Sequence, residues 1–541
     1  MPDPSTLPPT LDHAAAARWP TRAAAHALGL GLVFAIVAAL PASPSDLDRH
    51  QLPKETAVHL AVWLAVVLAR PFPALGLRRA AAWSGFLLLL ITLASAIGAT
   101  NLWIAERAAA LTLSGVAAFF TARHLAASGM TDILLGWAAS AAAIGTATGL
   151  AQAYGVTSPL FAATRAPGGT FGNRNFMAHF ATLALPLAAF ASLGAKRRQA
   201  LGGLVLVAML VAAIVLSRSR AAWLGAAAAA GVTVLALLLA RRRAALAIPR
   251  GRVSWLIAAA LLGVLGAVSI PNALQWRAAS PYAETLGDIA NRREGSGHGR
   301  MIQYRNTLRL AMAHPVLGVG PGNWPIRYAD VAPSSDPSWG FGDPVPLNPW
   351  PSSDWMAILS ERGIVAVVAI LLLGLALAWR GVIAVRAGGD RALSGAALLA
   401  LLAAAAVQGI FDAVLLLPTP VLFVAIVAAA LLQNADGTEA VIERVSRRRT
   451  RMGFVAVIIL GAVSLRSLSQ TAAYLVAGNG RDVARLTWAA RIDPGSYPIR
   501  IALAERGPCS AVRDDAAAAL RMAPSWPAPR AAARRCGVRS R

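Results

Sequence analysis

The sequence is divided by one long polar stretch, residues 271–355, whose centre reads HPVLGVGPGNW from His314 to Trp324. Proline, glycine and asparagine are frequent in this stretch, and apolar runs precede it and follow it. Loops longer than about a dozen residues seldom serve only as connections, and binding and catalytic residues are often found on them. We therefore expect the function to depend on this loop and the rest of the chain to hold it in place.

The composition predicts an all-α, polytopic integral membrane protein. The chain has 541 residues, of which 57% are hydrophobic, and its mean hydropathy is +0.58. About 20 apolar residues in a helix cross the hydrocarbon core of a bilayer. We predict thirteen spans, at about 24–41, 55–70, 80–99, 105–122, 132–154, 175–194, 199–216, 219–240, 253–270, 355–379, 394–413, 416–433 and 452–467.

The positive charge predicts the orientation of these spans. The net charge is +25, but most basic residues lie in short connections between apolar runs, so we expect no nucleic-acid partner. Basic residues concentrate in the cytoplasmic loops of inner-membrane proteins. The predicted regions are a cytoplasmic N-terminal tail (1–23), nine spans (24–270), a large periplasmic loop (271–354), four spans (355–467) and a periplasmic helical tail (468–541).

The C-terminal tail contains a weak repeat and both cysteines of the chain. Arg491, Pro494 and Arg500 recur thirty residues later as Arg521, Pro524 and Arg530. The spacing suggests helix–turn–helix units similar to tetratricopeptide repeats, although those are longer. In an oxidising compartment Cys509 and Cys536 could form a disulfide; two unpaired thiols are the alternative.

A glycine-rich motif, GGTFGNRNF at residues 168–176, lies directly before the sixth predicted span. Glycine permits tight backbone turns, and asparagine commonly caps the start of a helix. Asn173, Arg174 and Asn175 are therefore candidates either for substrate contacts or for a simple helix cap.

A second motif, SRSRAAW at residues 217–223, lies between the seventh and eighth predicted spans. Arg218 and Arg220 stand on the side of the membrane that should be poor in positive charge. Arginine near a bilayer is costly unless it is paired or functional, and its guanidinium suits phosphate oxygens. The alternative is an interfacial anchor whose charged end reaches water.

The long loop supplies the remaining candidates. Arg300 and Arg305 lie near His298 and could extend a cationic surface. His314 opens the turn-rich segment that contains Asn323, and the backbone amides of this segment could approach a ligand.

Two carboxylates follow at the start of the tenth span. Asp354 and Glu361 are two helical turns apart and so lie on one face of the helix. A capped helix start, with Ser353 or Asp354 as the cap, is the alternative. The sequence shows no metal-ligand spacing, phosphate-binding glycine–lysine loop or nucleophile elbow.

Taken together, these motifs resemble the O-antigen ligase and O-antigen polymerase superfamily of bacterial membrane glycosyltransferases. The resemblance rests on residues 169–176, 219–223 and 314–323, and on Asp354-Trp355 followed by residues 361–363, all in the family's order. It implies transfer of a glycan from undecaprenyl pyrophosphate to an acceptor hydroxyl, with no metal or other cofactor. The acceptor would be lipid A–core, another lipid-linked glycan or a protein side chain.

The resemblance also implies roles for particular residues. Arg220 and Arg300 would bind the pyrophosphate and stabilise the charge of the leaving group. The expected further substrate contacts are Arg174, Arg218, Arg305, Asn173, Asn175 and Asn323.

The sequence departs from the family at one position. Members usually carry a histidine just before the tenth span, and residues 352–354 here read Ser-Ser-Asp. Three interpretations stay open. Asp354 could accept the acceptor proton late in the reaction; its ordinary pKa is about 4. His298 or His314 could fold into the site. Lastly, the protein could bind carrier lipid without transferring sugar.

We expect a ligase that transfers glycan to lipid A–core in the bacterial inner membrane. A repeat-unit polymerase and a protein O-oligosaccharyltransferase are the alternatives within the family. A lipid or glycan transporter and a catalytically silent scaffold are the alternatives from other classes. A transporter predicts inverted repeats among the spans, and the sequence shows none.

Overall fold

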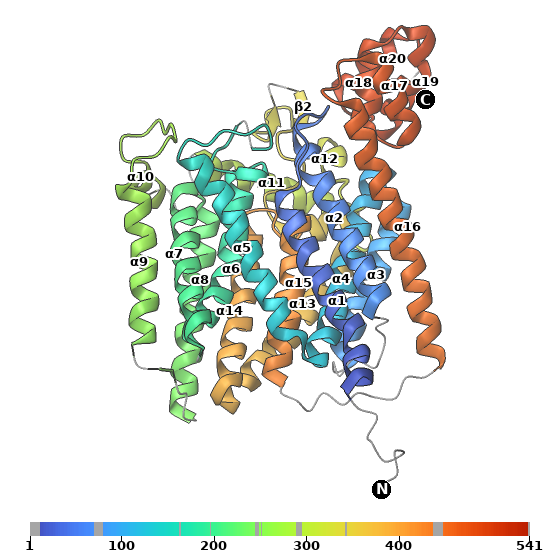
Figure 1. Cartoon of the computed structure of the whole chain (residues 1–541). Coiled ribbons are helices and arrows are strands. Elements are labelled where there is room, and N and C mark those ends of the chain that lie inside the picture. The colour runs from blue at the N-terminus through green and yellow to red at the C-terminus, as the bar shows by residue number, and fades with distance from the viewer. Residues whose placement is uncertain are drawn as a thin grey trace.

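The computed structural model describes residues 11–69, 79–161, 164–194, 196–243, 248–249, 251–287, 295–340, 343–436 and 447–538. It is a bundle of long, roughly parallel helices with a loop layer and a small helical domain on one face (Figure 1). The long helices are α1 (Leu11–Val37), α2 (Asp46–Ala69), α3 (Arg79–Ile97), α4 (Leu102–Leu125), α5 (Thr131–Ala153), α6 (Arg174–Leu193), α7 (Arg197–Ser217), α8 (Arg220–Arg243), α9 (Arg252–Ser269), α13 (Asp354–Ala387), α14 (Gly389–Phe411), α15 (Pro418–Asp436) and α16 (Arg447–Ala477).

The all-α, multi-pass fold predicted from the sequence is confirmed. Eleven described segments are long and apolar enough to cross a membrane. One of them, Leu102–Ala153, contains both α4 and α5, which are joined by one wide turn at Ala126–Met130. The apolar part of α3, Trp83–Ile97, is shorter. Each of the thirteen predicted apolar helices is therefore present.

Several helices extend beyond the predicted spans, and α2 begins at Asp46, nine residues before its predicted start. Helix α1 begins at Leu11, inside the predicted N-terminal tail, whose first ten residues lie outside the described part of the chain. Helix α13 continues to Ala387, and α16 continues ten residues beyond the predicted end of the last span, to Ala477. Hydropathy marks only the apolar part of a helix, so the polar extensions of α13 and α16 were not visible in it.

The helices approach one another closely where small residues meet. At Gly31 of α1, an added Cβ would lie 2.0 Å from the Cβ of Ala61 in α2. Small residues at such crossings allow van der Waals packing between backbones inside a bilayer, where no hydrophobic effect drives helices together. The buried core of α1, α2, α4–α8 and α13–α16 is accordingly rich in alanine and leucine.

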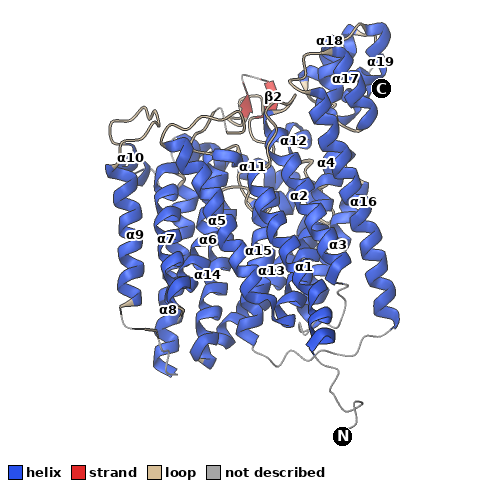
Figure 2. Ribbon diagram, in the orientation of Figure 1, coloured by secondary structure: helices blue, strands red, loops and turns tan. Residues whose placement is uncertain are grey.

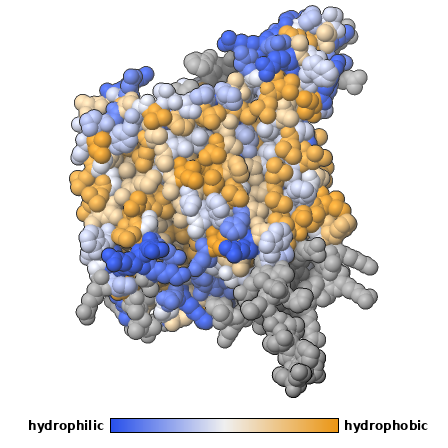
Figure 3. All heavy atoms as spheres, in the orientation of Figure 1, coloured by the Kyte–Doolittle hydropathy of each residue, from blue (hydrophilic) through white to orange (hydrophobic). Residues whose placement is uncertain are grey.

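On the face that Figure 3 shows, a band of apolar side chains runs across the bundle, with hydrophilic residues on the small domain and along the opposite rim. The structure is almost entirely helical, and the short strands lie in the loop layer (Figure 2). The loop layer consists of α10 (Pro281–Gly287), α11 (Gly295–Ala313), α12 (Trp324–Arg327) and an antiparallel pair, β1 (Trp339–Gly340) with β2 (Asp343–Pro346).

Helix α13 is broken near its outer end, at Gly363, where φ is 79°. The turn-rich segment of the long loop lies against this break. Val319 N–H donates to Ser360 O (2.9 Å), and Ile364 N–H donates to Pro315 O (2.9 Å). An added Cβ at Gly363 would lie 2.0 Å from Val316 O, so both the dihedral angle and the close contact require glycine. The break fastens the loop to the bundle.

The C-terminal domain contains four short helices above the end of α16 (Figure 1): α17 (Val483–Ile492), α18 (Tyr497–Arg506), α19 (Cys509–Met522) and α20 (Pro527–Arg535). The residues of the sequence repeat make the same contact in both halves. Arg500 Nε donates to Pro494 O, and Arg530 Nε donates to Pro524 O (2.7 Å). The repeat therefore corresponds to two similar helix pairs.

Cys509 and Cys536 are bonded to each other, 27 residues apart in sequence, which joins the start of α19 to the end of α20. Closing a loop of this length stabilises a folded domain by roughly 3 to 4 kcal/mol in the chain-entropy model. We expect Cys509→Ser to expose the tail to limited proteolysis at protease concentrations that leave the parent protein intact. The transmembrane part should be unaffected. Equal protease resistance of parent and variant would contradict this.

Candidate functional site

Two arginines of the predicted site enclose a tryptophan of the long loop. Arg174, the first residue of α6, and Arg218, in the α7–α8 turn, each lie 5.0 Å from the ring of Trp276. Arg218 also donates to Thr285 Oγ1 (2.8 Å) and pairs with Glu284 (2.5 Å) of α10. These contacts fix the loop to the outer ends of the helices and bring positive charge together.

A buried histidine lies beneath this surface. His179 of α6 is fully buried, and its Nε2 lies 3.5 Å from Ser219 Oγ and 3.9 Å from Asp412 Oδ2. Asn175 Nδ2 donates to the same Asp412 oxygen (3.2 Å). Asp412, in the α14–α15 connection, is half-buried. These four side chains form one polar group from three segments of the chain: α6, the α7–α8 turn and the α14–α15 connection.

Helix α11 adds a cation and a phenol to this group. Arg300 and Tyr304 are one helical turn apart, and the charge of Arg300 acts on both His179 and Tyr304. Tyr304 Oη lies 2.6 Å from Ser352 O and also contacts Ile410 O. Burial raises the pKa of Tyr304 to about 12, with Arg300 opposing and Asp412 adding to the rise, so the phenol stays protonated.

We call Asn175, His179, Arg300, Tyr304 and Asp412 the His179 cluster. Arg220 begins α8 directly after Ser219, beside the cluster. The predicted arginines Arg174, Arg218, Arg220 and Arg300 thus come to one region, where Arg165 adds a further charge that acts on Arg174. Five arginines against the two carboxylates Glu284 and Asp412 make this region strongly cationic. Such a region suits a phosphate-bearing ligand.

Asp354 is placed differently from the expectation. Its side chain is buried, and its carboxylate accepts the backbone N–H groups of Val414 (2.9 Å) and Leu415 (3.0 Å to one oxygen, 3.1 Å to the other). Ser353 Oγ accepts the N–H of Met356 and caps α13. The carboxylate of Asp354 thus holds the α14–α15 connection in place, and its role as a base stays a prediction.

Two other predicted residues have structural partners. Asn323 is fully buried, and its side chain bonds the backbone of Asn101 through both Oδ1 (2.7 Å) and Nδ2 (3.1 Å). Asn173 accepts the N–H of Asn175 (3.0 Å) and caps α6, as the alternative interpretation held.

Three candidates from the loop are not drawn into the His179 cluster. His314 is half-buried at the end of α11, where its carbonyl accepts the N–H of Gly318. His298 and Arg305 are exposed on α11. Among the described residues, no contact joins any of the three to the cluster.

Sequence reasoning missed His179, Tyr304 and Asp412. One available signal was the spacing of Asn175 and His179, which are four residues apart and so share a face of α6. Asp412 gave no such signal, because it reaches His179 only through the packing of α14 and α15 against α6.

A large cavity lies on the other side of the α14–α15 connection. Its volume is about 790 Å³, within the range of small-molecule sites. It runs between α2, α4, α13 and α15 and reaches the tail helices α18 and α20. Leu415 and Trp350 line it, and Trp350 lies 5.8 Å, between ring centres, from Phe176 of α6. The cavity and the His179 cluster therefore adjoin along residues 350–354 and 412–415.

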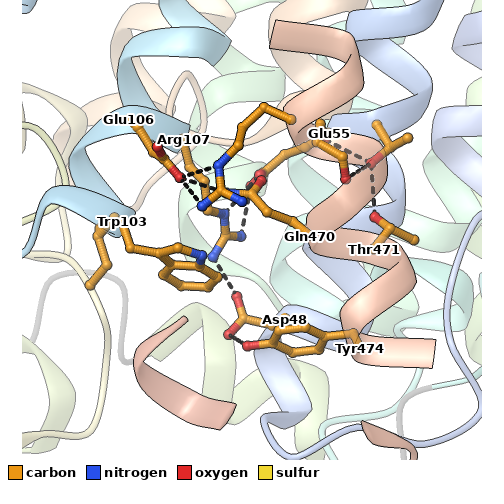
Figure 4. A network of polar contacts seen from close by, with 12 residues as sticks. Asp48, Glu55, Trp103, Glu106, Arg107, Gln470, Thr471 and Tyr474 are labelled. Atoms are coloured by element: carbon orange, nitrogen blue, oxygen red, sulfur yellow. Dashed lines mark hydrogen bonds and ion pairs between the residues drawn. The ribbon is translucent and has the colours of Figure 1, made fainter. Parts of the chain in front are cut away.

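A buried ionic network forms one wall of this cavity (Figure 4). Arg107 of α4 donates to both oxygens of Glu55 (2.9 Å each) and to Asp48 (2.9 Å). Tyr474 of α16 donates to the other oxygen of Asp48 (3.0 Å), and the guanidinium lies 4.5 Å from the ring of Trp103. The network joins α2, α4 and α16.

Contacts next to the network fasten the tail. Trp103 Nε1 donates to Asp493 (2.8 Å), at the end of α17. Arg466 pairs with the same Asp493 (2.8 Å) and with Glu106 (2.6 Å). The helix that enters the tail and the first tail helix are thereby held to α4.

We expect Arg107→Leu to destabilise the protein strongly, because it leaves two buried carboxylates without their cation. Breaking a buried ion pair typically costs 3 to 5 kcal/mol. Thermal unfolding of the detergent-solubilised protein should show a lower midpoint. Arg309→Leu, on the exposed face of α11, is the control and should leave the midpoint unchanged. A parent-like midpoint for Arg107→Leu would show that the network contributes little.

Comparison with known families identifies the central part of the chain. Residues 203–371 match the family model described as O-antigen ligase. This part of the chain is similar to the O-antigen ligase family, and we call residues 203–371 the O-antigen ligase domain. This domain extends from α7 through the long loop into α13 and contains Arg218, Arg220 and Arg300. The resemblance found in the sequence is confirmed. His179 and Asp412 lie outside the matched residues of the O-antigen ligase domain. Among proteins with curated descriptions, none matches the chain.

Proposed function

We propose that the protein is a metal-independent glycosyltransferase that moves a glycan from undecaprenyl pyrophosphate to an acceptor hydroxyl, with lipid A–core as the acceptor. The observation that carries the proposal is the O-antigen ligase domain, whose arginines converge on one end of a membrane-spanning bundle. A lipid-linked pyrophosphate lies at the membrane surface, at the depth of these helix ends.

The reacting face is the periplasmic face of the inner membrane in this proposal. The basic residues Arg197 and Arg241 lie at the ends of α7 and α8 that are far from the long loop, as expected for the cytoplasmic side. The Cys509–Cys536 bond in the tail fits an oxidising compartment. Both observations support a cytoplasmic N-terminus and a periplasmic tail.

The reaction would be a single displacement at the anomeric carbon. The acceptor oxygen forms the new bond while the bond to the phosphate oxygen breaks, so the configuration inverts and undecaprenyl pyrophosphate leaves with the electron pair. Arg220 and Arg300 would stabilise the negative charge that grows on the leaving group. Their positions are fixed by helices before the substrate arrives.

We assign the acceptance of the hydroxyl proton to Asp412. Asp412 is half-buried at the cationic region, with Oδ1 accepting the N–H of Ala413 (2.9 Å) and Oδ2 accepting Asn175 Nδ2 (3.2 Å). Asp354 is 1% exposed, and its carboxylate accepts the backbone N–H groups of Val414 and Leu415. Asn175 orients the Asp412 carboxylate, and His179 lies behind it as a second proton carrier. A carboxylate that accepts the proton late in the transition state serves as a general base.

A repeat-unit polymerase and a protein O-oligosaccharyltransferase share this donor chemistry. The tail beside the cavity offers a surface for a larger acceptor, and this favours the polymerase and the protein O-oligosaccharyltransferase. The experiment that separates the three is the envelope glycan pattern of a deletion strain, with lipid A-linked and carrier-linked material resolved on a gel. Polymer kept on the carrier with bare lipid A supports the ligase. Single repeat units on lipid A indicate the polymerase. An unchanged pattern in both fractions would overturn both.

A further inference from the structure

The 790 Å³ cavity has an apolar end deep among the spans. Phe119 and Phe120 of α4, Leu377 of α13 and Ala428 of α15 line this part. All four lie within membrane-spanning segments, at least ten residues from the outer ends of their helices. A slot lined in this way suits an alkyl chain, because burying apolar surface is favourable at roughly 25 cal/mol per Å².

The outer part of the cavity is polar but not cationic. Its lining contains four carboxylates and three guanidinium groups: Asp48, Glu55, Glu361 and Glu505 against Arg107, Arg362 and Arg506. The region around the His179 cluster has five arginines against two carboxylates. A pyrophosphate is therefore favoured at the His179 cluster and not in the cavity. A neutral head group with many hydroxyls fits a lining that offers both donors and acceptors.

Two buried polar groups of the lining still have unused bonding capacity. Gln51 Oε1 and Arg362 Nε have no hydrogen-bond partner among the described residues, although both side chains are more than nine-tenths buried. Buried polar atoms normally find a partner, in the protein or in a bound molecule. A ligand in the cavity could supply such partners.

The tail forms the roof at the mouth of the cavity. Tyr497 of α18 and Trp526 of α20 line the mouth, with their rings 5.3 Å apart and nearly perpendicular. Trp526 Nε1 and Ser525 Oγ donate to Pro325 O (3.3 Å) and Ile326 O (3.1 Å) of the long loop. The aromatic rings are thereby held over the opening. Aromatic rings with a polar edge bind well where a ligand is partly apolar and partly hydroxylated, as a sugar ring is.

We infer that this cavity is the acceptor site and that it takes a glycolipid, with the acyl chain among α4, α13 and α15 and the sugars under Tyr497 and Trp526. That the ligand is the acceptor rests on the proposed function, whereas its chemical class is argued from the lining of the cavity alone. The site adjoins the His179 cluster along residues 412–415, so a sugar hydroxyl at this wall lies close to Asp412. The tail thus selects the acceptor.

Binding of a photoreactive glycolipid analogue tests the inference without any glycan transfer. The probe is an alkyl maltoside with a diazirine at the end of its chain, added to the full-length protein in lipid nanodiscs. Mass spectrometry of the labelled peptides should place the cross-links on α13 and α15. Saturation should require roughly tenfold more probe for Trp526→Ala, as expected for the loss of one aromatic contact in a binding site.

Two further variants make the result decisive. Trp488→Ala is the matched control, since Trp488 is 61% exposed on the tail and does not line the cavity; it should bind like the parent. Leu377→Trp fills the apolar end without touching the tail and should also weaken labelling. Cross-links confined to outward-facing residues such as those of α9, or parent-like labelling of both Trp526→Ala and Leu377→Trp, would overturn the inference.

The proposed function and the inference about the cavity can each be overturned without the other. Arg300→Ala should bind the probe like the parent, because Arg300 does not line the cavity. Retained probe binding together with an unchanged glycan pattern in the deletion strain would leave a glycolipid site in a protein that is not the proposed transferase. Parent-like labelling of both Trp526→Ala and Leu377→Trp would remove the cavity inference whatever the glycan pattern.

Discussion

Arg300→Ala is expected to lower the rate of glycan transfer by roughly 10² to 10³-fold, the range seen when one preplaced charge-stabilising group is removed from an active site. Arg300 has no hydrogen-bonded or ion-paired partner among the described residues, and its charge acts on His179 and Tyr304. Its removal therefore leaves the fold intact and takes away a cation that the leaving pyrophosphate needs.

The measurement is transfer by membranes that contain equal amounts of parent and variant protein. Arg309→Ala, nine residues further along the same helix, should transfer at the parent rate; among the described residues Arg309 donates a hydrogen bond only to Asn306. Arg220→Ala should resemble Arg300→Ala. Transfer at the parent rate by both Arg220→Ala and Arg300→Ala would remove the arginines from the mechanism.

Asp412→Asn is the second large effect that we expect. The amide cannot accept a proton from the acceptor hydroxyl, and removal of a positioned base typically costs about 10² to 10⁴ in rate. The shape of the side chain is conserved, so thermal stability and donor binding should stay close to those of the parent. A parent-like rate would exclude Asp412 as the base.

Asp354→Asn provides the contrast. Its carboxylate accepts the N–H groups of Val414 and Leu415, and the amide group of asparagine can replace only one of the two acceptor oxygens. A buried N–H left without an acceptor costs about 1 to 3 kcal/mol. We expect a lower unfolding midpoint, with activity reduced only as far as folded protein is lost. A stable, inactive Asp354→Asn would instead support Asp354 as the base.

The apolar helices were predictable because a run of about 20 mostly apolar residues marks each span in the sequence. The two Arg-containing turns were also found from sequence, since Arg218 and Arg220 break the charge pattern of the connections around them. The pairing of Cys509 and Cys536 and the repeated arginine and proline residues of the tail likewise needed only local spacing.

What could not be predicted depends on contacts between distant segments. Asn323 stands in a motif that suggested a ligand contact, but its partner Asn101 is 222 residues away and takes up both ends of its side chain. Asp354 was chosen for its place in the motif, and only the structure shows it bonded to the α14–α15 connection. His179 was not singled out from the sequence, because its partner Asp412 lies 233 residues further along the chain.

The position of the tail helices after α16 in the chain has a consequence for biosynthesis. Helix α16 is one continuous helix of 31 residues, about 46 Å long, and the tail is made only after it. The walls of the cavity are therefore synthesised before the tail helices that cover its mouth. In the topology that we propose, the cavity closes only when α16 has entered the membrane and the helices α17–α20 have crossed it and folded. A nascent or truncated chain would hold the same slot open toward lipid and solvent. If the tail selects the ligand as we propose, completion of α17–α20 decides when the protein can first discriminate between ligands.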